Sequence, residues 1–84
     1  MVVISEHAKK QIGKRGITEE EVADIVEHGE VTHEERDDRF GTKKHCRLDC
    51  GGAYLVVIWF YNRKGEKEVA TVFWRRKKRP SFTA

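Results

Sequence analysis

The longest apolar run in the sequence, Ala53 to Tyr61, places the tightest limit on the fold. It has the length of a β-strand and falls well short of the roughly 20 apolar residues that a membrane-spanning helix needs. Both of its alternating sets of side chains are apolar, so we expect a central strand that is covered on both faces. Helices can cover one face. A ligand, a partner subunit or the C-terminal tail is expected to cover the other.

The residues around this run predict an antiparallel meander. Phe40 to Asp49 reads as a strand that ends in the turn Cys50-Gly51-Gly52, and Lys67 to Arg76 reads as the last strand. The loop between the last two strands, Asn62-Arg63-Lys64-Gly65, has the glycine typical of a hairpin. Residues 30–35 are expected to add a further strand with Val31 and His33 on one face, followed by a polar turn at 36–39.

Two helices are predicted before the sheet. Ser5 can cap a helix that runs to Arg15 and ends at Gly16. Thr18 and Glu21 form a capping box for a second helix, which ends at Gly29. Residues 2–4 are expected to be a short apolar strand or a hydrophobic staple.

We therefore predict an α+β fold in which two N-terminal helices pack on a three- to four-stranded antiparallel sheet. Residues 1–76 are expected to form a single domain, and residues 77–84 a basic, mobile tail.

The composition of 38% hydrophobic and 37% charged residues excludes a membrane protein and a disordered chain. The net charge of +3 conceals a sorted sequence, because residues 17–38 carry ten acidic side chains against Arg36 alone. Residues 39–84 carry twelve basic side chains against three acidic ones. Such sorting indicates a polyanionic partner, or else ordinary solvated faces. Because the N-terminus lacks the pattern of a signal peptide, we expect a cytoplasmic protein.

The first predicted helix places His7, Gln11 and Arg15 along one stripe, with Lys10 and Lys14 beside it. Imidazole can move a proton near neutral pH, and guanidinium can hold two phosphate oxygens. The stripe therefore suits a phosphodiester. The alternative is a capped, solvated helix whose His7 packs against the next element.

In the predicted strand at residues 40–49, successive side chains should point to opposite faces of the sheet. Lys43, His45 and Arg47 should share one face, and Cys46 and Leu48 should share the core face. The basic face is expected to be exposed to solvent or to form part of a site, and lysines on an edge strand also discourage aggregation.

The last strand runs into five consecutive basic residues, Arg75 to Arg79, which follow Phe73 and Trp74. Aromatic rings can stack on unpaired bases while basic side chains bind phosphates. The alternative is a solubilising tail after core aromatics.

His33, His45, Cys46 and Cys50 are the candidate ligands for a metal such as zinc. The two cysteines are too far apart for a compact C-x2-C knuckle, and His45 and Cys46 should point to opposite faces. We therefore expect no cofactor and two reduced cysteines.

Three segments, Ser5-Glu6-His7-Ala8, Arg15 to Val22 and Glu27 to Val31, resemble a small bacterial family of unknown function, the DUF4258 type. Ala53 to Val57 and Val69 to Trp74 are similar to its two final strands. The family looks related to RelE/ParE/BrnT-like toxins. The resemblance thus implies a RelE/barnase-like fold and metal-independent ribonuclease chemistry, in a toxin–antitoxin type system.

By position, the resemblance implies functional roles for His7 and Arg15. The family usually has arginine where this chain has Gln11.

These observations favour an RNA-binding domain, in its catalytic form a metal-independent endoribonuclease. His7 or His45 would act as acid or base, and positive charge would come from Arg15, Lys43 and Arg75. The residues expected to contact RNA are Lys10, Gln11, Lys14, Arg47, Trp74, Arg76, Lys77, Lys78 and Arg79.

Two other hypotheses stay open. One is a non-catalytic interaction module for an acidic, antitoxin-type protein or for a second copy of the chain, with no membrane partner. The other is a small zinc-binding domain.

Overall fold

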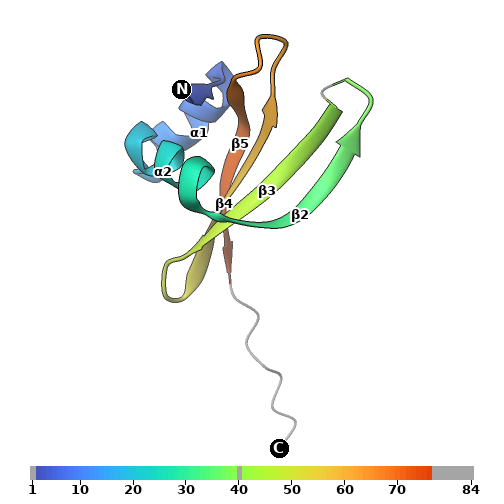
Figure 1. The fold of residues 1–84 in the computed structure, drawn as a ribbon. Coiled ribbons are helices and arrows are strands. Elements are labelled where there is room, and N and C mark those ends of the chain that lie inside the picture. Colours follow the sequence, from blue (N-terminus) through green and yellow to red (C-terminus); the bar gives the residue numbers. More distant parts are fainter. Residues whose placement is uncertain (1, 40, 77–84) are drawn as a thin grey trace, which may run out of the picture.

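The structure, a computed structural model, describes residues 2–39 and 41–76. These residues form two helices and five strands (Figure 1). In chain order the elements are β1 (Val2–Ile4), α1 (Glu6–Arg15), α2 (Glu19–His28), β2 (Glu30–Asp37), β3 (Gly41–Asp49), β4 (Ala53–Tyr61) and β5 (Lys67–Arg76).

All five strands belong to one mixed sheet with the order β1-β5-β4-β3-β2. The strands from β2 to β5 pair antiparallel, whereas β1 pairs parallel with the start of β5. The α+β class and the two helices are confirmed, but the prediction of three or four antiparallel strands is wrong. The fifth strand is the short run at residues 2–4, whose pairing with Lys67 to Val69 joins distant parts of the chain.

Both helices begin and end where the capping residues predict. Ser5 Oγ accepts a hydrogen bond from the Ala8 amide at 3.2 Å, and Gly16 takes the left-handed conformation, with φ of 65°, after α1. Thr18 and Glu21 form the complete capping box of α2. Each helix has ten residues, and no helix in the described part of the chain is long and apolar enough to cross a membrane.

The two helices lie together on one side of the sheet and bury the main core there (Figure 1). Their contribution includes Ile12, Val22 and Ile25, which pack with the β4 side chains Leu55 and Val57. The alternation predicted for residues 43–48 is confirmed, because Cys46 is fully buried on this side of the sheet. We call this side the helix face.

The opposite side of the sheet, which we call the outer face, carries the second apolar set of β4. Val56 and Phe60 belong to it and are only 6% exposed, although neither is part of the core cluster beneath the helices. The prediction that β4 is apolar on both faces is confirmed. The outer face thus has a small apolar floor of its own, bordered by the polar side chains of β2, β3 and β5.

A register irregularity in β2 decides which of its side chains reach the outer face. In β2, Val31 pairs with Cys46 while His33 pairs with His45 across an irregularity at Thr32. Since pairing partners share a face, Val31 lies on the helix face and His33 on the outer face. The prediction that Val31 and His33 share a face is therefore wrong. β2 also continues to Asp37, so the polar turn is shorter than predicted.

Candidate nucleic-acid interface

A cavity of about 220 Å³ opens on the outer face toward the turn between β3 and β4. Four strands contribute to it, and its polar side chains are mostly basic or aromatic. The lining residues are Thr32, His33, His45, Arg47, Tyr54, Val56, Phe73 and Arg75. His45, Arg47 and Arg75 are sequence-predicted site residues that the structure brings together here.

The hairpin registers explain this convergence. Arg47 lies opposite Val56, which in turn lies opposite Phe73. One step nearer the turn, Tyr54 lies opposite Arg75. The two arginines therefore lie on β3 and β5, on either side of β4, with their backbones roughly 12 Å apart. Apolar and aromatic side chains of β4 fill the floor between them.

The two arginines are available to an anion. The Arg47 guanidinium lies over the Tyr54 ring at 4.4 Å from its centroid, which supports the flat face of the group and leaves its edge for hydrogen bonds. Within residues 2–39 and 41–76, neither Arg47 nor Arg75 forms an ion pair with a carboxylate. The cavity thus carries positive charge that this part of the chain does not neutralise.

Two histidines lie side by side at the β2–β3 wall of the cavity. The rings of His33 and His45 meet edge to face, with centroids 5.1 Å apart. Glu35 Oε2 lies 3.4 Å from His45 Nε2, and Thr32 Oγ1 donates to the His45 carbonyl at 3.3 Å. His45 is therefore oriented by a carboxylate, an arrangement that suits a proton-transfer group.

Lys43 shares the outer face with His45 but does not line this cavity. Its Nζ lies 3.4 Å from Asp37 Oδ2. The predicted catalytic lysine therefore lies beside the cavity and contacts Asp37, the last residue of β2.

The predicted stripe on α1 lies on the other side of the sheet and contacts β5. Gln11 Oε1 accepts hydrogen bonds from Thr71 Oγ1 and the Val72 amide, both at 2.8 Å. Arg15 donates to the Val72 carbonyl at 3.3 Å. The structure thus gives these two side chains partners within the fold, and it does not bring them near His45. Three other predicted residues of α1 are exposed: His7, Lys10 and Lys14.

The aromatic and basic residues predicted to bind a polyanion at the end of β5 are divided between the two faces. Phe73 and Arg75 line the outer-face cavity, whereas Trp74 pairs with Leu55 of the core and so lies on the helix face. Arg76 alternates with Arg75 and shares the side of Trp74. Lys77, Lys78 and Arg79 lie outside the described residues.

The four candidate metal ligands are also divided. Cys46 Sγ is buried in the core and accepts a hydrogen bond from Trp59 Nε1 at 3.1 Å, while Cys50 is exposed in the turn. His33 and His45 lie on the outer face. Among the described residues, no group of three histidine, cysteine or acidic side chains could hold a metal ion.

Sequence reasoning missed the role of Tyr54 and gave His33 a chemical role only as a metal ligand. The hairpin turn could have revealed Tyr54. Counting outward from Cys50-Gly51-Gly52 pairs Asp49 with Tyr54 and Arg47 with Val56. No comparable signal exists for His33, because the irregularity at Thr32 that turns it to the outer face has no mark in the sequence.

Comparison with known proteins identifies a family. The family model described as a domain of unknown function (DUF4258) matches residues 4–74, which include every helix and almost the whole sheet. No curated protein and no solved structure gives a significant match. The chain belongs to the DUF4258 family.

Proposed function

We propose that this domain binds RNA through the cavity on the outer face. The observation that carries the proposal is the convergence of Arg47 and Arg75 with Tyr54 and Phe73 on a face that neither α1 nor α2 covers. Guanidinium groups bind phosphate oxygens, and aromatic rings stack on bases. Lipids and free anions need no aromatic wall, so this pairing favours a nucleic acid.

The size of the cavity supports an unpaired strand as the ligand. Its volume of about 220 Å³ lies below the range of typical small-molecule pockets. One unstacked base can enter such a recess, whereas the bases of a duplex remain stacked inside the helix.

The same cavity carries groups that suit cleavage, and our proposal extends to a metal-independent endoribonuclease. One histidine of the pair His33 and His45 would take the proton from a ribose 2′-hydroxyl, which attacks the adjacent phosphorus. The bond to the 5′-oxygen breaks, the second histidine protonates that oxygen, and a 2′,3′-cyclic phosphate remains. Arg47 and Arg75 would stabilise the charge of the transition state.

A relationship to the RelE/ParE/BrnT-like toxins is part of this proposal. Two helices on one face of a mainly antiparallel sheet support it, as does the basic site on the outer face. The parallel β1 is a difference from the sheet that this resemblance implies.

The test is binding and cleavage of an unstructured RNA at low salt in the presence of a chelator. We expect saturable binding and products that end in 2′,3′-cyclic phosphate. Binding without any cleavage would limit the function to RNA binding. Absence of both would overturn the proposal.

A second candidate function is a protein-interaction module, and one observation favours it. Three apolar side chains on the helix face remain well exposed: Val31 (44%), Leu48 (46%) and Trp74 (43%). Leu48 and Trp74 flank the buried Leu55 in the pairing register, and Arg76 lies beside them. An acidic partner with an apolar stripe would fit this surface, as would a second copy of the chain. Light scattering distinguishes the two, because a copy doubles the mass of the purified protein.

A further inference from the structure

We propose that the outer face carries a second nucleotide subsite, at the end of the sheet opposite the cavity described above. It is formed around Arg63 in the loop between β4 and β5. The inference rests on the proposed function, because it extends the same bound strand along the same face. It assigns roles to Arg63, Phe60 and Glu68, for which the sequence predicted none.

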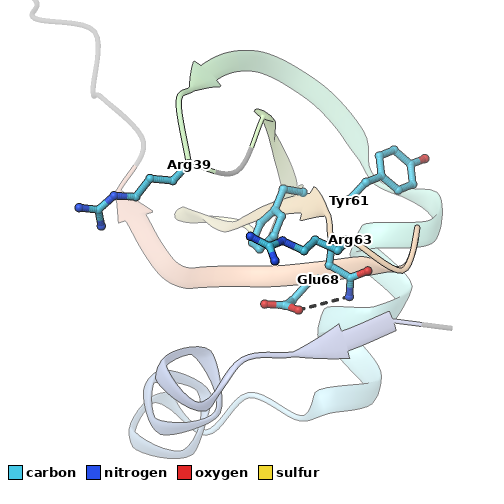
Figure 2. A pocket seen from close by; sticks show the side chains of 6 residues that line it. Arg39, Tyr61, Arg63 and Glu68 are labelled. Atoms are coloured by element: carbon cyan, nitrogen blue, oxygen red, sulfur yellow. Dashed lines mark hydrogen bonds between the residues drawn. The ribbon is translucent and has the colours of Figure 1, made fainter.

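A hollow of about 340 Å³ marks this place, lined by Arg39, Phe60, Tyr61, Asn62, Arg63 and Glu68 (Figure 2). Phe60 pairs with Glu68 across β4 and β5, and Phe60 belongs to the same alternating set as Val56. The hollow therefore lies on the outer face. Figure 2 shows Arg63 and Glu68 close together in it, while the Tyr61 ring points away.

The loop that carries Arg63 is held in place before any ligand binds. Asn62 Oδ1 accepts hydrogen bonds from the amides of Lys64, at 3.0 Å, and Glu66, at 2.9 Å. Gly65 provides the left-handed conformation, with φ of 77°, that closes the loop. Asn62 Nδ2 also donates to Glu68 Oε1 at 3.3 Å. The backbone of Arg63 is thus fixed on both sides, which reduces the entropy lost on binding.

The chemistry of the hollow matches a nucleotide. Within the described ranges, Arg63 forms no ion pair with a carboxylate, so its guanidinium group can bind phosphate oxygens, whereas the Arg39 side chain extends away from Arg63 and Glu68 (Figure 2). The Glu68 carboxylate would repel a phosphate but can accept hydrogen bonds from the amino group of a base. Phe60 provides an apolar wall. Charges of both signs beside an aromatic ring therefore place the phosphate near Arg63 and the base near Glu68.

The spacing of the two sites sets the length of strand that can reach both. Val56 in the first cavity and Phe60 in the second hollow are four positions apart on β4, which corresponds to roughly 13 Å. A stacked strand rises about 3.4 Å for each nucleotide, so about four nucleotides span the distance. An oligonucleotide of two residues can occupy only one site, whereas one of six residues can occupy both.

The experiment measures the dissociation constants of cytidine oligonucleotides of two and six residues at fixed salt. The wild-type protein is compared with Arg63→Ala and with Lys64→Ala, a neighbouring exposed lysine of the same loop that does not line the hollow. We expect the wild type to bind the longer oligonucleotide more tightly. Arg63→Ala should weaken that binding about tenfold, as is typical for one charge-assisted contact, and should leave the shorter one unchanged. Lys64→Ala should match the wild type.

Four results would overturn the subsite. Equal binding of the longer oligonucleotide by Arg63→Ala and the wild type would remove it while leaving the proposed function intact. If Arg63→Ala weakened the binding of both oligonucleotides equally, the effect of Arg63 would come from its charge alone and not from a subsite. The same would follow if Lys64→Ala weakened binding as much as Arg63→Ala. If the wild type bound neither oligonucleotide, the proposed function itself would fail, and the subsite with it.

Discussion

The side-chain oxygen of Gln11 in α1 lies 2.8 Å from the backbone nitrogen of Val72 in β5 and accepts its hydrogen bond. This contact lies directly after a register irregularity, where Val69 and Val72 are both fully buried although they are three positions apart. An uninterrupted strand would turn one of them outward. Gln11 therefore helps to hold the alternation that directs Phe73 and Arg75 to the outer face.

Replacement of Gln11 by leucine should lower the free energy of unfolding by about 1–3 kcal/mol, because the Val72 amide loses its acceptor in a partly buried place. Gln11→Glu keeps an acceptor and should cost less. Urea unfolding measures both, with Lys10→Ala on the exposed surface of α1 as the control. Equal stability of Gln11→Leu and Lys10→Ala would contradict a structural role for Gln11.

The two cysteines allow a comparison between a buried and an exposed position, which tests the packing of the core. Cys46 Sγ accepts the indole N–H of Trp59 at 3.1 Å in a buried place, whereas Cys50 is exposed in a turn. Cys46→Ala should lower the free energy of unfolding by about 1–3 kcal/mol, since it removes buried volume and leaves the indole N–H without a partner. Cys50→Ala should stay within about 0.5 kcal/mol of the wild type. Denaturant unfolding of the two variants under reducing conditions provides the comparison, and equal midpoints would refute this view of the core.

Much of the fold could be predicted because its signals are local. The capping residues Ser5 and Thr18 mark both helix starts, and the alternation at 43–48 predicts which side of β3 faces the core. The bounds of β4 and β5 follow from an apolar run and from a loop that ends in glycine. Each of these features depends on residues close together in the chain.

The rest depends on contacts between distant residues. Nothing in Val2 to Ile4 indicates a parallel partner at Lys67 to Val69, because the two segments come from opposite ends of the described chain. The irregularity in β2 reverses the predicted face of His33. Gln11 and Arg15 looked like an anion site on an isolated helix, but in the fold they bind the backbone and side chains of β5. The candidate site was therefore predicted in part, through His45, Arg47 and Arg75.

The two predicted catalytic histidines now lie on opposite sides of the sheet, which separates their roles. His45→Asn should lower the rate of RNA cleavage by about 10²- to 10⁴-fold, as expected for loss of a general acid or base, with little change in affinity. His7→Asn should leave the rate unchanged, because His7 is exposed on α1. Single-turnover cleavage with excess protein measures the chemical step directly. If only His7→Asn lost activity, the catalytic site would lie on α1 and the assignment to His45 would be wrong.

The most direct test of the RNA-binding surface uses two adjacent arginines that point to opposite faces. Arg75 lines the outer-face cavity, while Arg76 alternates to the helix face. Arg75→Ala and Arg76→Ala remove the same charge, so they differ only in the side of the sheet that loses it. The dissociation constant for a six-residue RNA is measured for each variant over a series of salt concentrations.

We predict that Arg75→Ala weakens binding about tenfold and reduces the slope of log affinity against log salt by about 0.7, the value for one lost phosphate contact on a single strand. Arg76→Ala should keep the wild-type affinity and slope. Equal losses in the two variants, or a loss in Arg76→Ala alone, would contradict the assignment of RNA binding to the outer face.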